Sequence, residues 1–178
     1  MTTMTTTHAT TLSGAIAFCD IVGFTELTAD HGDEVALALV EYHEAMTRAL
    51  LPDGARIVKQ LGDGLLLFFG DAPGAVDALV RLHADCRGAA VAEVPLWIRT
   101  GLHWGSPRVR GDDLIGHDVN LASRVVALAA PGELLVTDAY VDACPDTRER
   151  LVELGPVFVK GVTDPIGVWR LRDDHEDM

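Results

Sequence analysis

A Gly-Asp-Gly sequence between two short apolar runs constrains the fold of this chain most. The runs cover residues 55–61 and 65–69, and Gly62-Asp63-Gly64 lies between them. Asp-Gly between two runs of strand length is the strongest short-range signal for a β-hairpin. The sequence therefore predicts a β-hairpin formed by these two runs.

The other periodic segments predict helices that alternate with strands. Helices are predicted over residues 34–51, 75–87 and 119–129. Strands are predicted over residues 14–21, 96–104, 108–110, 133–137, 157–162 and 166–171, with 108–110 as the neighbour of the strand before it. Strand pairs that alternate with helices predict an α+β fold, in which helices pack on a mostly antiparallel sheet.

Composition bounds the size and the partners of the chain. With 178 residues, 48% of them hydrophobic, the chain predicts one domain over residues 13–172, between a flexible Thr-rich tail (1–12) and an acidic tail (173–178). No apolar run approaches the roughly 20 residues of a membrane span, and no signal-peptide pattern is present, so we expect a cytoplasmic protein. The net charge of −13 argues against nucleic acid and anionic membranes as partners.

Two aspartates follow strand-like segments. Asp20 comes directly after the apolar run Ala15–Cys19, and Asp63 lies at the tip of the predicted hairpin. If the first strand lies beside the hairpin, both carboxylates reach the same edge of the sheet. Two carboxylates held close repel unless a cation lies between them, and Mg²⁺ or Mn²⁺ suits oxygen ligands. The alternative is that Asp20 caps a strand end and that Asp63 is an ordinary turn residue.

A glycine-containing turn follows Asp20 at Gly23-Phe24-Thr25. Such a turn, leading into a helix, can direct backbone N–H groups at a phosphate.

Lys59 stands in an apolar segment, where it alternates with Ile57 and Leu61. The alternation predicts that the lysine shares a face with both neighbours, which is unfavourable unless its ammonium group meets an acceptor. The alternative is an edge strand on which Lys59 opposes aggregation.

Asn120 and Arg124 are four residues apart, so they share one face of the predicted third helix. Ser123 lies in the same polar sector, and most of the helix is otherwise apolar. A fixed guanidinium beside an amide suits a charge that develops on phosphorus. The alternative is an arginine that pairs with a core or interface carboxylate.

In this order, the motifs resemble the class III nucleotidyl cyclase catalytic domain over about residues 14–171. The four motifs that carry the resemblance are Phe18-Cys19-Asp20-Ile21-Val22-Gly23-Phe24-Thr25, Lys59-Gln60-Leu61-Gly62-Asp63-Gly64, Gly111-Asp112-Asp113-Leu114-Ile115-Gly116 and Val119-Asn120-Leu121-Ala122-Ser123-Arg124. Late in the chain, Leu154-Gly155 and Val159-Lys160-Gly161 also look like the family's closing strands. Four ordered motifs at family-like spacing are far more specific than one glycine-rich loop. The resemblance implies the family's fold, a ferredoxin-like or palm-like sheet with helices packed on it.

The resemblance also implies a metal site and a base-reading pair. Asp20 and Asp63 match the family's two metal-binding aspartates, with help from the Ile21 carbonyl, and two Mg²⁺ or Mn²⁺ ions are implied per site. Lys59 and Asp113 match the pair that reads adenine. Guanylate cyclases of the family typically carry Glu and Cys or Ser at these two positions, so the resemblance implies ATP as substrate.

The implied reaction converts ATP to 3′,5′-cyclic AMP and pyrophosphate. In the family, the asparagine that matches Asn120 orients the ribose, the arginine that matches Arg124 stabilises the transition state, and Lys160 matches a triphosphate contact. The resemblance implies a head-to-tail homodimer with two shared sites, because the metal aspartates come from one subunit and the other groups come from its partner.

Three rival interpretations remain open from the sequence. A non-catalytic nucleotide-binding module of the same fold predicts no turnover, although such proteins usually lose an aspartate, the asparagine or the arginine. A guanylate cyclase predicts turnover of GTP. An α+β interaction domain predicts no metal-dependent nucleotide binding.

Overall fold

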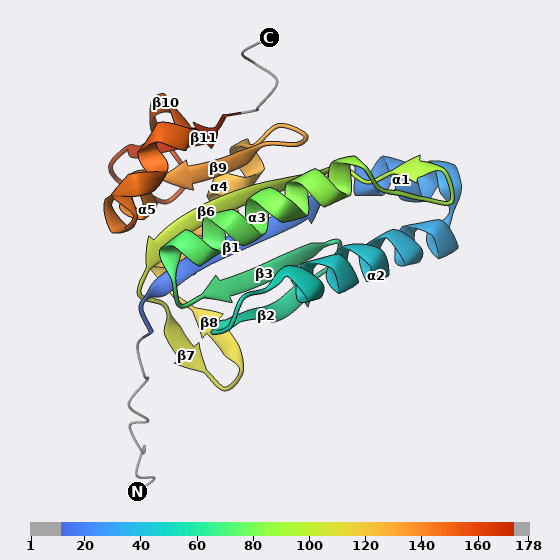
Figure 1. Cartoon of the computed structure of the whole chain (residues 1–178), viewed down its shortest axis with the longest axis horizontal. Coiled ribbons are helices and arrows are strands. Elements are labelled where there is room, and N and C mark those ends of the chain that lie inside the picture. Colours follow the sequence, from blue (N-terminus) through green and yellow to red (C-terminus); the bar gives the residue numbers. More distant parts are fainter. Residues whose placement is uncertain (1–11, 173–178) are drawn as a thin grey trace, which may run out of the picture.

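The computed structural model describes residues 12–172, so the predicted tails (1–12 and 173–178), apart from Leu12, lie outside the described residues. Seven strands form one sheet in the order β10-β11-β9-β6-β1-β3-β2 (Figure 1). The strands of this sheet are β1 (Gly14–Ile21), β2 (Ala55–Leu61), β3 (Gly64–Phe69), β6 (Ile98–Gly105), β9 (Leu134–Thr137), β10 (Leu151–Val157) and β11 (Ile166–Leu171). The helices are α1 (Phe24–His31), α2 (Asp33–Leu50), α3 (Ala72–Arg87), α4 (His117–Leu128), α5 (Asp138–Ala143) and the 3₁₀ helix η1 (Pro145–Arg150).

Two short ribbons stand apart from this sheet. One joins β4 (Ala90–Val91) to β5 (Val94–Pro95), and the other joins β7 (Arg108–Arg110) to β8 (Asp113–Ile115). Every neighbouring pair in the main sheet is antiparallel except β6 and β9. The predicted α+β fold with a mostly antiparallel sheet is therefore confirmed.

Alternation along β1 divides the core between the two faces of the sheet. Ala15, Ala17 and Cys19 belong to a cluster with residues of α2 and α3, whereas Ile16 and Phe18 pack with residues of α4. Side chains at successive positions of a strand point to opposite faces, so a strand with both faces covered is apolar throughout. This explains why β1 reads as a continuous apolar run.

The backbone of helix α4 contacts the backbone of the sheet at Gly101 of β6. A Cβ atom at this position would lie 2.3 Å from the backbone nitrogen of Val126, and one at Gly105 would lie 2.5 Å from the carboxyl carbon of Asp118. Only glycine permits such an approach. The two glycines therefore fix the height of α4 above the sheet.

Two predictions about strands were wrong. The segment 108–110 pairs with β8 and not with the strand before it, in the register Arg108↔Ile115. The strand predicted over 157–162 is instead β10 (Leu151–Val157), and the following residues turn back, with Val162 N donating to Val159 O at 3.2 Å. Gly161 has a φ of 76°, a left-handed conformation that ends strand geometry.

No helix among the described residues is long and apolar enough to cross a membrane.

Candidate active site

A β-bulge in β2 turns Lys59 to the α4 face of the sheet. Ile57 lies opposite Leu67, whereas Lys59 lies opposite Leu66, so one extra residue stands between them. Because directly opposed residues share a face, Ile57 faces α2 and α3, and Lys59 faces the same side as Leu66. The prediction that Lys59 and Ile57 share a face was therefore wrong.

The ammonium group of Lys59 meets the carboxylate of Asp113. Lys59 Nζ lies 2.8 Å from each carboxylate oxygen, and Asp113 Oδ1 also accepts a hydrogen bond from Leu114 N at 2.7 Å. The hydrogen bond from Lys59 is the largest influence that lowers the pKa of Asp113. More than a third of each side chain is exposed, so the pair adds little to stability and is accessible to a ligand.

The ribbon that carries Asp113 is held against β2 at a second point. Arg56 Nη1 donates to the backbone oxygen of Asp112 at 2.8 Å. The β7–β8 ribbon is thus fixed to β2 by neighbouring side chains, which positions Asp113 beside Lys59.

Asp20 and Asp63 lie at the same edge of the sheet. Asp20 pairs with Gly64, the residue after Asp63, so the end of β1 meets the hairpin turn. Burial raises the pKa of Asp20, the charge of Asp63 raises it further, and Arg99 opposes both. The carboxylate of Asp63 is therefore close enough to act on Asp20, as the cation hypothesis requires.

Gly64 leaves room for the Asp20 carboxylate. A Cβ atom at Gly64 would lie 2.3 Å from Asp20 Oδ1. The oxygen donors of Asp20, Asp63 and the Ile21 carbonyl fit a hard divalent cation, whose remaining ligands can be water and substrate phosphate. No group of three or more His, Cys, Asp or Glu residues that could hold a metal occurs among residues 12–172, so the protein offers an incomplete shell.

Arg99 is a site residue that the sequence reasoning missed. It lies opposite Asp20 across β1 and β6, and its Nη2 is 3.7 Å from Asp20 Oδ2. Its Nε atom is buried without a hydrogen-bond partner in the described structure. A buried donor without a partner is costly, so Arg99 is suited to bind an anionic group that arrives beside Asp20.

Gly23 begins α1 directly after the Asp20 strand. Its φ of 67° is left-handed, and no side chain caps the N-terminus of the helix. Backbone N–H groups in the first turn, at Phe24 and Thr25, are therefore available for an anion. The predicted turn leading into a helix is confirmed, while its phosphate contact remains a prediction.

Asn120 and Arg124 occupy one side of α4, as predicted from their spacing. Asn120 is exposed, and its carbonyl accepts a hydrogen bond from Ser123 Oγ at 2.7 Å. The Arg124 guanidinium lies against the turn between β10 and β11, because a Cβ atom at Gly161 would be 2.9 Å from Arg124 Nη1. Within the described part of the chain, Arg124 has no ion-pair partner, so pairing with a core carboxylate is not seen there, while pairing with an interface carboxylate is untested.

Lys160 precedes Gly161 and is exposed. The structure thus brings Lys160 and Arg124 into one neighbourhood at the α4 side of the β10–β11 turn.

Hydrogen bonds and ion pairs join these residues in two pairs, Lys59 with Asp113 and Asp20 with Arg99. None between residues 12 and 172 joins Asp20 to Arg124. The chain thus presents three features, namely the Lys59–Asp113 pair, an acidic edge (Asp20 and Asp63) and the Asn120–Arg124 face of α4.

Comparison with known proteins identifies the family of this chain. The family model described as the adenylate and guanylate cyclase catalytic domain matches residues 8–172, and the chain belongs to this family. An uncharacterised protein of Mycobacterium tuberculosis is 36% identical over 89% of this chain and 41% of its own length. A protein of Streptomyces coelicolor named adenylate cyclase is 34% identical over 76% of this chain and 35% of its own length.

The fold is also that of solved cyclases. The structure of an adenylate/guanylate cyclase/hydrolase from Silicibacter pomeroyi has a TM-score of 0.80 and 26% identity, covering 94% of this chain and all of that one (100%). This confirms the predicted class III cyclase fold. The chain spans less than half the length of the curated relatives named above.

Proposed function

We propose that this domain is an adenylate cyclase, which converts ATP to 3′,5′-cyclic AMP and pyrophosphate. The observation that carries the choice of substrate is the Lys59–Asp113 pair on the α4 face of the sheet. Lysine donates hydrogen bonds and an ionised aspartate accepts them. Adenine offers a ring-nitrogen acceptor and an exocyclic amine donor, which match the two side chains.

Guanine fits this pair less well. It has a carbonyl oxygen where adenine has the exocyclic amine. The carboxylate of Asp113 would then lie opposite that carbonyl, and neither group can donate a hydrogen bond to the other. A mismatch of this kind, enclosed by bound substrate, would leave polar groups unpaired and discriminate between substrates. Relatives named adenylate cyclase support the same choice.

The edge of the sheet that carries Asp20 and Asp63 is proposed to hold divalent cations. Asp20, Asp63 and the Ile21 carbonyl would be the protein ligands, with Mg²⁺ or Mn²⁺ as the ion. When bound, such ions lower the pKa of the ribose hydroxyl and neutralise charge on the phosphates.

The protein's own groups then orient the reactants. Asn120 would hold the ribose so that its 3′-oxygen faces the α-phosphorus in line with the bond to pyrophosphate. The new O–P bond forms as that bond breaks, and the Arg124 guanidinium would stabilise the charge on the transferred phosphoryl group. Backbone N–H groups at residues 23–25 and Lys160 would bind the triphosphate. Positioning and electrostatics supply the catalysis.

A head-to-tail homodimer would complete the site. No hydrogen bond or ion pair among the described residues joins the acidic edge to the Asn120–Arg124 face, and a two-fold axis can bring one chain's edge to its partner's helix. Each dimer would then hold two equivalent sites. The proposal predicts an inactive monomer.

The test is product formation by purified protein, with ATP or GTP and with Mn²⁺ or Mg²⁺, over a range of protein concentrations. The proposal expects cyclic AMP from ATP, with specific activity that rises with protein concentration. Cyclic GTP at a comparable rate would reverse the choice of substrate. No cyclic nucleotide from a folded sample would favour the non-catalytic nucleotide-binding module.

A further inference from the structure

A buried histidine, His103 of β6, lies behind the first turn of α4. It is opposite Ile16 of β1, so its side chain points to the face of the sheet that α4 covers, and it is 5% exposed. Its Nδ1 lies 2.8 Å from Thr137 Oγ1, and its Nε2 lies 3.6 Å from Asp118 Oδ1. The ring therefore lies between the end of β9 and the start of α4.

Asp118, the second residue of α4, contacts the end of β6 at two further points. Its Oδ2 accepts a hydrogen bond from Ser106 N at 2.6 Å. Its carboxylate also lies over Gly105, where a Cβ atom would be 2.5 Å from Asp118 Oδ2. No side-chain hydrogen bond caps α4, whose N-cap residue is Gly116. The carboxylate of Asp118 is thus used to hold the first turn of the helix to the sheet, and not to cap the helix.

The order of hydroxyl, imidazole and carboxylate resembles that of a nucleophilic triad, but this cluster cannot act as one. Thr137 is 2% exposed, so its hydroxyl group is out of reach of a substrate. The imidazole ring lies between two groups of the same chain and is itself buried. The cluster therefore acts through the elements that it holds together.

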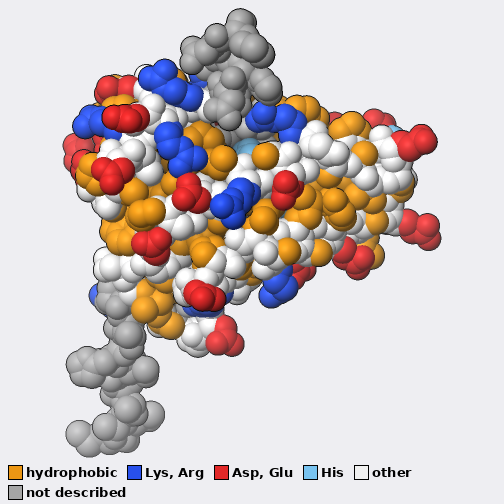
Figure 2. All heavy atoms as spheres, in the orientation of Figure 1, with side chains coloured by type: hydrophobic (Ala, Val, Ile, Leu, Met, Phe, Trp, Pro, Cys, Tyr) orange, Lys and Arg blue, Asp and Glu red, His pale blue; other side chains and the backbone are white. Residues whose placement is uncertain are grey.

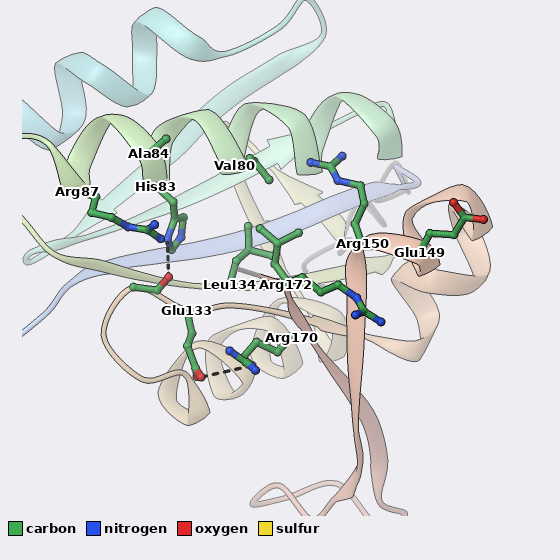
Figure 3. Close-up of a pocket in the computed structure, with 12 residues that line it drawn as sticks. Val80, His83, Ala84, Arg87, Glu133, Leu134, Glu149, Arg150, Arg170 and Arg172 are labelled. Carbon is green, nitrogen blue, oxygen red and sulfur yellow. Dashed lines mark hydrogen bonds and ion pairs between the residues drawn. The ribbon is translucent and has the colours of Figure 1, made fainter. Parts of the chain in front are cut away.

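A second buried histidine, His83, belongs to the opposite face of the sheet. Figure 2 shows little histidine on the visible surface, which belongs to the side of α2 and α3. His83 Nδ1 is 3.1 Å from the backbone oxygen of Gly132, and its Nε2 is 2.8 Å from Thr100 Oγ1. In Figure 3 its ring projects from α3 at the wall of a pocket of 440 Å³. His83 thus holds α3 and the turn before β9, away from the first turn of α4.

Asn120 lies two residues after Asp118 and is exposed. Its side chain has no hydrogen-bond partner between residues 12 and 172, so its position depends on the helix backbone that carries it. Its backbone N donates to Gly116 O at 3.2 Å, in the first turn of α4. The ends of helices fray unless other contacts hold them. The contacts of Asp118 therefore bear directly on where the Asn120 side chain lies.

We propose that Asp118 and His103 are positioning residues, which hold the first turn of α4 so that Asn120 meets the ribose in a fixed orientation. This assignment rests on the proposed function, in which Asn120 orients the ribose. Neither Asp118 nor His103 needs to touch the substrate. A displacement of about 1 Å in a positioning group can lower a rate by about 100-fold, so one carboxylate two residues away has a large effect.

The first experiment measures kcat and KM for ATP in Asp118→Ala. The expected result is a kcat lower by about tenfold or more and a KM within about threefold of wild type, because orientation is lost and binding is kept. In the Asn120→Ala background, the same change should cost less than about twofold, because the two residues act through one contact. Asp118→Asn keeps an oxygen acceptor for Ser106 N and should retain most of the activity. An equal loss in both backgrounds, or a change in KM alone, would overturn the proposal.

Amide hydrogen exchange of the full chain tests the same contacts without turnover. In Asp118→Ala and in His103→Ala, the Asn120 amide should exchange about tenfold faster or more, because its bond to Gly116 O opens more often. His83→Ala is the matched control, since it removes a buried imidazole from the opposite face and should leave exchange at Asn120 unchanged. Unchanged exchange in Asp118→Ala, or equal acceleration in His83→Ala, would overturn the proposal. A wild-type protein without turnover would refute the cyclase activity, and the exchange rates would still decide whether Asp118 holds Asn120.

Discussion

Lys59 Nζ contacts both carboxylate oxygens of Asp113 at 2.8 Å, although the two residues are 54 positions apart in the chain. The contact depends on the bulge between Ile57 and Lys59, because without it Lys59 would face α2 and α3. A bulge that redirects one side chain next to a site is a recurrent device in sheets. One extra residue in β2 thus brings Lys59 and Asp113, the proposed base-reading pair, to the same face.

The first prediction tests this pair. Lys59→Glu combined with Asp113→Ser should lower kcat/KM for ATP by roughly 100-fold or more, because the adenine edge loses its matched donor and acceptor. Turnover of GTP should rise relative to that of ATP. The measurement is the rate of both cyclic products with each nucleotide. An unchanged preference for ATP would mean that other residues read the base.

The second prediction concerns the room beside Asp20. Gly64→Ala should lower metal-dependent turnover by roughly 10- to 100-fold, because the new methyl group displaces the Asp20 carboxylate. Thermal unfolding measures whether the fold is kept. Gly70→Ala is the matched control, since its Cβ atom would meet only an ordinary contact of 3.7 Å with Gly54 O. Equal losses in both variants would point to a general effect on the hairpin.

The third prediction tests the shared site. Asp20→Ala and Arg124→Ala should each be inactive alone, and an equal mixture should recover about a quarter of wild-type activity, because half the dimers are mixed and each mixed dimer keeps one intact site. Circular dichroism should show that both variants are folded. Failure to recover activity, with subunit exchange demonstrated by labelled chains, would contradict a site built from two chains.

The fourth prediction concerns acid stability. His43 is 1% exposed, and burial lowers its pKa to about 4 from an ordinary value of 6.5. The unfolded chain therefore binds a proton in this pH range that the folded chain does not, and the free energy of unfolding should fall as the pH falls from 6.5 towards 4. The loss over the whole range is about 3 kcal/mol.

Urea unfolding at about pH 5 and about pH 7 measures this dependence. His43→Gln should flatten the dependence, although His103 contributes in the same direction because burial also lowers its pKa. An equally steep dependence in the variant would assign the effect to other groups.

Local chemistry explains why much of the fold could be predicted from the sequence. The hairpin was predicted because its turn, Gly62-Asp63-Gly64, demands a specific backbone conformation, and Gly62 indeed has a φ of 64°. The position of Asn120 and Arg124 on one side of α4 was predicted from helical spacing alone. The bulge in β2 could not be predicted, because Ile57 and Val58 are both apolar and either could occupy either face.

Features that depend on pairing between distant segments were missed. Arg99 joins the site only through the register of β1 against β6, which alternation within one strand does not reveal.

The backbone contact between α4 and Gly101 has a mechanical consequence. Because the two backbones are in close contact, we expect a displacement of α4 to displace β6 as well. Arg99 lies on β6 and the Asn120–Arg124 face lies on α4, so we expect the two to move together within a chain. In the proposed homodimer, a signal that switches activity would therefore have to change the distance between the two chains.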